Sequence, residues 1–138
     1  MLISNFDDLL QTARYESLPQ RLLFVFVATE LPTDCTEQQR QEFENGQGGA
    51  LAPLMCVDKS PQELDSFAAL SREAAQFEQP WGLVFAAAMS GAAPGQPPSD
   101  VAIDQALQGM VENLKQGRID GYIPFDQNGL PVRIEQKS

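Results

Sequence analysis

The chain has 138 residues, of which 19 are acidic, 9 are basic and none is histidine, so its formal net charge at neutral pH is -10. This charge repels phosphate backbones and anionic membrane surfaces, so we expect neither nucleic acid nor a membrane as a partner. The lack of histidine excludes Ser-His-Asp triads, Cys-His dyads and zinc sites of the cysteine and histidine kind, and we expect no metal and no cofactor.

The length suits one domain over residues 1–138, large enough to bury a substantial core. Two cysteines, Cys35 and Cys56, are too few for a disulfide framework. Asp7 and Asp8 interrupt any signal-peptide core, and no apolar run reaches the length of a membrane span. These features predict a cytoplasmic protein.

The first two elements are a helix and a strand. Residues 4–17 predict a helix with Ser4 or Asn5 as N-cap and an apolar stripe on one face. The following run, 22–28, is apolar at every position, which is typical of a central strand with both faces covered.

The middle of the chain alternates helices and strands. Residues 36–46 predict a weak, polar helix that Gly46 ends, and residues 51–57 predict a strand in which Pro53 disfavours a fully paired central position. Ser60 and Glu63 form a capping box, so we expect a helix to begin there, with an apolar stripe of Leu64, Phe67, Leu70, Ala74 and Phe77. GLVFAAAMSG, at 82–91, predicts a third strand covered on both faces.

The last elements are a helix and a hairpin. Ser99 caps a predicted helix that Gly117 ends. Asn128-Gly129 favours a two-residue hairpin loop in which both residues have positive φ. Counting outward pairs residues 127 with 130, 125 with 132 and 123 with 134.

These elements predict an α/β fold. We expect a mixed sheet of about five strands with a central βαβαβ unit and right-handed crossovers, helices covering the sheet, and a C-terminal antiparallel hairpin.

A candidate site follows from the parallel strands of that fold. Ligands favour the carboxyl ends of parallel strands, where Glu30, Asp58, Lys59 and Ser90 would gather. Such a group would bind a small polar molecule, or magnesium through its acids. The alternative, which we favour, is that Asp58 and Lys59 are structural residues beside a helix cap.

Two other motifs have simpler interpretations. The glycines of GQGG, at 46–49, open a strand and not a helix, so a helix stop followed by a turn explains them better than a phosphate loop does. Cys56 lies in an apolar run, which favours a buried and inert thiol over a nucleophile.

The segments FENGQGGALAPLMCVDK, PWGLVFAAAMSG and FDQNGLPVRI resemble, over most of the chain, a small family of uncharacterised bacterial proteins of about this length, some labelled "ribonucleotide reductase subunit alpha". Enzymes of that kind hold a large barrel with more cysteines than the two found here, so the label has no support in this chain. The resemblance implies a bacterial cytoplasmic protein, and no catalytic residue follows from it.

Two functions remain open. The first, which we favour, is a non-enzymatic binding or regulatory protein, with a homodimer formed through the sheet edge or an apolar helix face. The second is a small enzyme or metabolite-binding domain that uses Glu30, Asp58, Lys59 and Ser90.

Overall fold

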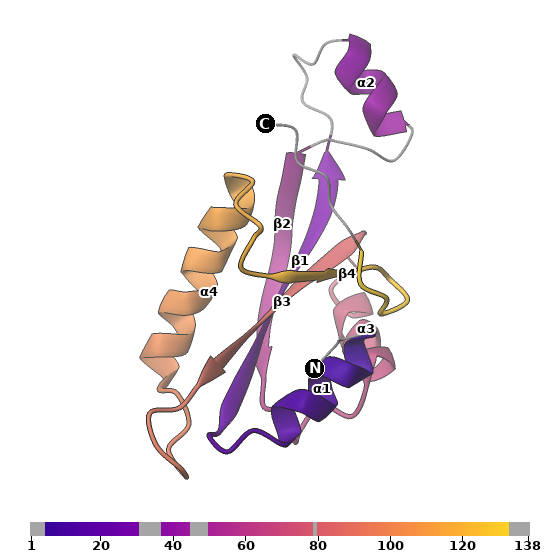
Figure 1. Cartoon of the computed structure of the whole chain (residues 1–138). Coiled ribbons are helices and arrows are strands. Elements are labelled where there is room, and N and C mark those ends of the chain that lie inside the picture. Colours follow the sequence, from indigo (N-terminus) through magenta and orange to yellow (C-terminus); the bar gives the residue numbers. More distant parts are fainter. Residues whose placement is uncertain (1–4, 31–36, 45–49, 79, 133–138) are drawn as a thin grey trace.

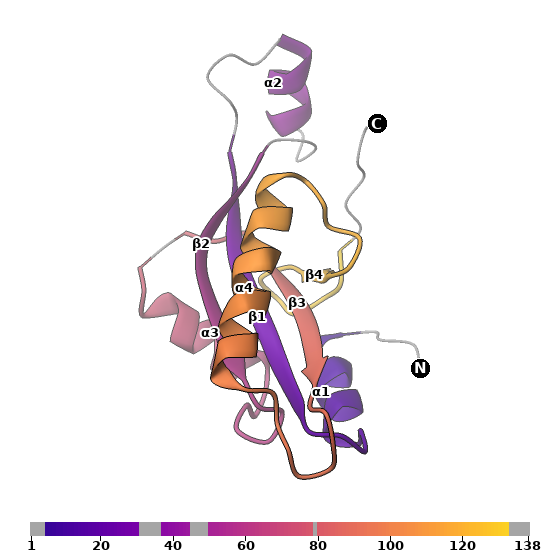
Figure 2. The same cartoon turned by 90° about the vertical axis from the view of Figure 1, so that its left-hand side faces the viewer.

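The computed structural model describes residues 5–30, 37–44, 50–78 and 80–132, without the side chains of 29, 30, 39, 42–44 and 50. A twisted sheet lies between helices on both of its faces (Figures 1 and 2). In chain order the elements are α1 (Phe6–Arg14), β1 (Gln20–Glu30), α2 (Glu37–Glu44), β2 (Ala50–Lys59), α3 (Phe67–Ala75), β3 (Leu83–Ser90), α4 (Asp100–Lys115) and β4 (Ile123–Phe125).

The strand order is β2-β1-β3-β4, and each strand pairs with its neighbours in the antiparallel direction. The mixed α/β class is therefore confirmed, but the predicted parallel βαβαβ unit is wrong. Antiparallel neighbours need no helical crossover between them. Because only one large apolar residue, Phe43, lies in the α2 segment, that helix lacks the apolar stripe by which a crossover helix covers a sheet.

The centre of the sheet is β1, as its apolar sequence predicts. Every side chain from Leu22 to Val27 is at most 3% exposed. Leu22, Phe24 and Phe26 face one side of the sheet, and the three residues that alternate with them face the other.

One side of the sheet carries an aromatic cluster beneath α1 and α3. The ring of Phe6 lies 5.4 Å from that of Phe24, 5.0 Å from that of Phe67 and 5.2 Å from that of Phe125. Trp81 packs edge-on against Phe26, with 5.0 Å between the ring centres. Aromatic pairs at such distances stabilise a core beyond the area they bury.

The other side of the sheet is covered by α4, which buries Ile103, Leu107, Met110 and Leu114. Ser99 is its N-cap, as predicted, and its hydroxyl accepts a hydrogen bond from the amide of Ala102 at 3.1 Å. Coverage of β3 is incomplete, however, because Ala88 is exposed on the side opposite α4. The prediction that both faces of β3 are shielded therefore holds only for its first half.

The capping box predicted at Ser60 forms, but it does not begin the helix. The Glu63 amide donates to the Ser60 hydroxyl at 3.3 Å, and the Ser60 amide donates to the Glu63 carboxylate at 3.1 Å. These bonds close a single turn, and α3 begins after a second N-cap, Ser66. The helix ends before Phe77, which is 53% exposed and does not belong to the buried stripe.

The C-terminal hairpin differs from its predicted register by one residue. Phe125 is bridged to Pro131, whereas the predicted loop pairs it with Val132. Asn128 does not have a positive φ, and only Gly129 in this loop does, with φ of 78°. The oxygen Oδ1 of Asp126 accepts hydrogen bonds from the amides of Asn128 at 2.8 Å and Leu130 at 3.1 Å, which favours a longer loop.

The hairpin therefore contributes less to the sheet than expected. Its first arm is β4, and its second arm is an isolated bridge within the described residues. Four strands, and not five, make up the described part of the sheet. The predicted pairing of residues 123 and 134 lies partly outside the described residues, because residue 134 is not among them.

Candidate functional site

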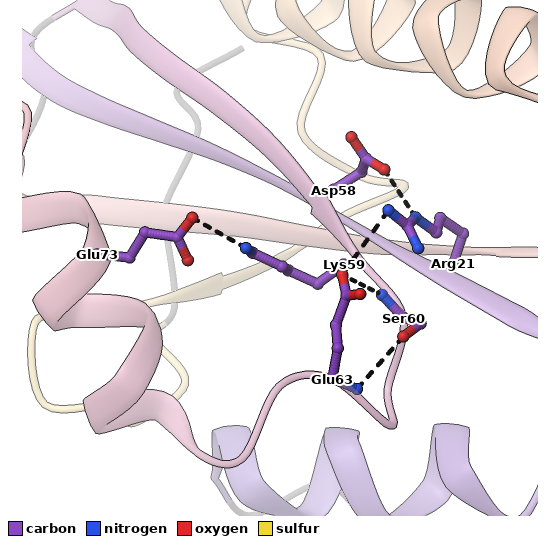
Figure 3. A network of polar contacts seen from close by, with 6 residues as sticks. All are labelled: Arg21, Asp58, Lys59, Ser60, Glu63 and Glu73. Carbon is purple, nitrogen blue, oxygen red and sulfur yellow. Dashed lines mark hydrogen bonds and ion pairs between the residues drawn. The ribbon is translucent and has the colours of Figure 1, made fainter.

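Charged side chains gather at the end of β2, where the chain leaves the sheet for α3 (Figure 3). Nε of Arg21 on β1 lies 2.7 Å from a carboxylate oxygen of Asp58, and Nη2 of Arg21 lies 3.7 Å from Oε1 of Glu63. Nζ of Lys59 lies 2.9 Å from Oε1 of Glu73 on α3. We call these five residues, with Ser60, the polar network.

The strand geometry divides the polar network between the two faces of the sheet. Asp58 and Lys59 are consecutive on β2, so their side chains point to opposite faces. Asp58 meets Arg21 on the α4 side, whereas Lys59 reaches α3. A single small ligand would therefore not contact both charged groups from one side.

The contacts of the polar network have a structural explanation. The paired side chains are between 24% and 48% exposed, and an ion pair in such surroundings contributes about 0.2–1 kcal/mol to stability. Together with the Ser60–Glu63 turn, they fix the path of the chain from β2 to α3. This agrees with the structural role that we favour for Asp58 and Lys59.

The antiparallel sheet separates the four predicted site residues. Lys59 lies opposite Leu22 at the start of β1, whereas Glu30 lies opposite Ala50 at the other end of the sheet. Eight residues of strand separate these ends, a distance of about 26 Å. Glu30 is thus not brought together with the other three, and its side chain lies outside the described residues.

Ser90 lies at the same end of the sheet as Asp58 and Lys59. It is opposite Gln20, whose amide nitrogen Nε2 donates a hydrogen bond to the Ser90 hydroxyl at 2.8 Å. The strand β1 lies between it and β2. Three of the four predicted residues therefore share one end of the sheet.

Arg21, Glu63 and Glu73 complete the polar network but were not predicted as site residues. Only Glu63 had a local sequence signal, the Ser-x-x-Glu pattern of a capping box. Arg21 and Glu73 are brought in by strand pairing and by the return of α3, and neither relation is visible in a local pattern.

A second feature lies on the α4 face, where β2 and α4 line an open hollow of about 410 Å³. Its lining residues are Cys56, Asp104, Leu107, Gln108, Val111 and Glu112. The apolar part comes from Leu107 and Val111, and the acidic side chains of Asp104 and Glu112 are exposed. We call this feature the β2–α4 hollow.

Cys56 is exposed in this hollow, which corrects the prediction of a buried thiol. Partial desolvation raises the pKa of the Cys56 thiol, and the negative charges of Asp58 and Asp104 raise it further. A raised pKa lowers the thiolate fraction at neutral pH, and the thiolate is the form that reacts as a nucleophile. The inertness of the thiol stays a prediction.

Within the described part of the sheet, β2 is an edge strand, and some of its main-chain groups face away from β1. The amide of Gly91 donates to the carbonyl of Pro19 at 2.8 Å. Successive residues of a strand point their main-chain N–H and C=O groups alternately to the two neighbouring strands. Since residue 19 bonds to the β3 side, odd residues of β1 point these groups to β3 and even residues point them to β2. Cys56 and Asp58 lie opposite odd residues of β1, so their N–H and C=O groups point away from the sheet.

Pro53 fits the same alternation. The ladder shifts by one residue between Phe26 and Val27, which leaves Leu54 as the extra residue of a bulge and places Pro53 opposite Val27. Pro53 therefore also points its main chain outward, where a missing N–H breaks no bond within the sheet. Its position confirms that β2 is not a central strand.

Within the described ranges, no group of three or more metal-ligating side chains is found. None of the described helices has both the length and the apolar character needed to cross a bilayer.

Comparison with known proteins finds no matching family model, no similar curated protein and no similar solved structure. The resemblance to the bacterial family described above therefore stays a prediction.

Proposed function

We propose that this protein is a non-enzymatic binding or regulatory protein of the cytoplasm that binds a partner chain along the outer edge of β2. The observation that supports the proposal is the outward direction of the N–H and C=O groups of Cys56 and Asp58 at an edge strand. Unpaired main-chain groups in a row are a template for an added strand.

The described part of the β2 edge is short, and it is exposed at Cys56. The bulge at Leu54 and the proline at 53 interrupt the row, so the continuous stretch for pairing runs from residue 54 to residue 59. Cys56 is exposed and its neighbours on β2 are half-buried. A short extended segment fits this stretch better than a long strand does.

The experiment is a selection of peptides from an unbiased library on the immobilised protein, followed by affinity measurements on two variants. Cys56→Pro removes an outward N–H without removing a bond to β1, and Cys56→Ala is its matched control. We expect selected peptides to bind the wild type and Cys56→Ala equally, and Cys56→Pro at least about tenfold more weakly. Circular dichroism would establish that Cys56→Pro is folded.

Equal binding to all three proteins would overturn the proposal. A homodimer formed through this edge, which the sequence favours as one form of binding, would support it. In that case the wild type would sediment as a dimer and folded Cys56→Pro as a monomer.

A second candidate function is a small enzyme or a metabolite-binding domain, because Asp58, Lys59 and Ser90 lie at one end of the sheet. A ligand there would compete with the ion pairs Arg21–Asp58 and Lys59–Glu73. A thermal-shift screen of metabolites, nucleotides and divalent ions tests it, since a ligand of the folded state raises the Tm. The expected result is a shift that Asp58→Asn removes, and a silent screen counts against this candidate.

A further inference from the structure

We infer that the segment recognised by the β2 edge is an extended peptide in which basic side chains alternate with apolar ones, the basic side chains covering the β2–α4 hollow. This inference rests on the proposed function, since it assigns the chemistry of the partner that the edge binds.

The first step is the direction of the side chains on an added strand. Such a strand would lie about 4.8 Å beyond β2, and its successive side chains would point alternately to the two faces of the sheet. On one face it would adjoin Met55 and Val57, which pack against the aromatic core. On the other face it would adjoin Cys56 and the hollow. Apolar side chains suit the first face.

The second step is the charge around the hollow. Asp104 and Glu112 stand exposed on α4. Desolvation contributes most to the raised pKa of Cys56, and the negative charges of Asp58 and Asp104 add to it, so both carboxylates act on the thiol in the hollow. Two basic groups lie near these acids. Lys115 is 3.6 Å from Glu112 with both side chains more than half exposed, and Arg21 is held by Asp58. Among the described residues Asp104 has no such ion pair, so the described part of the rim carries a net negative charge.

The third step is the match of spacing. Asp104 and Glu112 are eight residues apart on α4, or about 12 Å along the helix axis. Residues four apart on a strand are about 13 Å apart and share one face. Because α4 runs alongside β2 in both views (Figures 1 and 2), two basic residues four positions apart would meet both acids. The apolar stems of lysine or arginine would lie over Leu107 and Val111.

Charge also favours a basic peptide over a second copy of the chain as the occupant of this edge. Each copy carries a formal net charge of -10, so two copies repel one another, whereas a basic segment is attracted. A basic and apolar peptide is therefore the occupant that the surface fits.

The experiment measures the affinity of a seven-residue peptide that alternates lysine and valine. The control peptide replaces each lysine with glutamate. On the protein, Asp104→Lys is compared with Glu16→Lys, which makes the same change of charge. Glu16 is exposed and follows α1, the helix that packs on the face of the sheet opposite α4. We expect Asp104→Lys to weaken binding at least about fivefold and Glu16→Lys less than about twofold.

Two further readouts locate the peptide. In a Cys35→Ser background, bound peptide should slow the alkylation of Cys56, which is exposed in the hollow. Methylation of every second peptide nitrogen should abolish binding in one of the two alternate patterns and not in the other, because only one set of N–H groups faces β2. If both methylation patterns weakened binding equally, or if Asp104→Lys and Glu16→Lys weakened it equally, the attraction would be non-specific. Either result would overturn the inference.

The result also separates this inference from the proposed function. If the library selects acidic or neutral peptides whose binding Cys56→Pro abolishes, the edge binds a partner but the inferred chemistry is wrong. The same conclusion follows if the wild type forms an edge-dependent dimer. If no binding depends on the edge, both proposals fail.

Discussion

Gly129 lies against the ring of Phe67, so closely that a Cβ atom on the glycine would stand 2.9 Å from Cγ of Phe67. The glycine also has a φ of 78°, and its carbonyl accepts a hydrogen bond from the amide of Phe6 at 2.9 Å. The hairpin loop, α1 and α3 therefore meet at this residue. Any side chain here would meet both a steric contact and an unfavourable backbone conformation.

The first prediction separates these two costs. Gly95 has the same φ of 78°, but apart from its chain neighbours no atom of the described residues lies within 4 Å of the position that a Cβ would occupy there, so Gly95→Ala carries the conformational cost alone. We expect Gly95→Ala to lower the free energy of unfolding by about 1 kcal/mol and Gly129→Ala by about 2–4 kcal/mol. Urea denaturation measures both. Equal losses would mean that the Phe67 ring moves aside at little cost.

The second prediction concerns Asp126, whose carboxylate accepts two main-chain amides of the same loop. Asp126→Ala leaves these donors without that acceptor and should lower the free energy of unfolding by about 1–2 kcal/mol. Asp126→Asn keeps an oxygen at Oδ1 and should cost less than half as much. If both variants were as stable as the wild type, the Asp126 side chain would not set the loop conformation, and the register would need another explanation.

The hairpin shows why its register could not be predicted from Asn128-Gly129 alone. The dipeptide favours a two-residue loop, but a three-residue loop with a glycine at the left-handed position is the next commonest form. Here the side chain of Asp126, which precedes the dipeptide, bonds to the amides beyond it and selects the longer loop. The result is a shift of one residue in all the pairs that follow.

The strands were predictable and their pairing was not. The apolar residues from Leu22 to Val27 predict a central strand wherever its neighbours come from, because burial on both faces depends on coverage and not on direction. Direction depends on the connections. The polar segment 37–44, with Phe43 as its one large apolar residue, lacks the stripe of a crossover helix, whereas the regular alternation of elements favours the parallel arrangement.

The direction of the strands also decides which of the predicted site residues lie together. Asp58, Lys59 and Ser90 lie at one end of the sheet in either topology, but Glu30 joins them only if β1 and β2 are parallel. The β2–α4 hollow had no local signal at all, since it is formed by Cys56 on a strand and by Asp104 on a helix that lies far along the chain. Proximity of that kind follows from packing and not from periodicity.

The third prediction concerns Glu78, which follows α3 and has a φ of 55°, the left-handed value that glycine adopts at the end of many helices. Glu78→Gly removes the steric cost of that conformation and should raise the free energy of unfolding by about 0.5–1 kcal/mol. Glu78→Ala keeps the Cβ atom and should not stabilise the protein. Thermal and urea denaturation distinguish the two, and a stabilising Glu78→Ala would show that the charge, and not the backbone, matters.

The fourth prediction concerns the reactivity of Cys56, which is exposed and yet has a raised pKa. Desolvation contributes most to the rise, and Asp58 and Asp104 contribute by disfavouring a second negative charge nearby. Since the thiolate is the reacting form, alkylation at pH 8 in a Cys35→Ser background should be slower than in the urea-unfolded chain. As the pH is raised, the alkylation rate of the folded protein should reach its plateau at a higher pH than that of the unfolded chain.

The two aspartates are tested separately from burial. Asp58→Asn and Asp104→Asn should each lower the pKa of Cys56 and speed alkylation at pH 8 by about twofold, because a neutral amide no longer opposes the thiolate. Glu16→Gln removes a negative charge on the side of the sheet opposite α4 and should leave the alkylation rate of Cys56 unchanged. An equal rise in all three variants would mean that the overall charge of the protein, and not the two neighbouring carboxylates, controls the thiol.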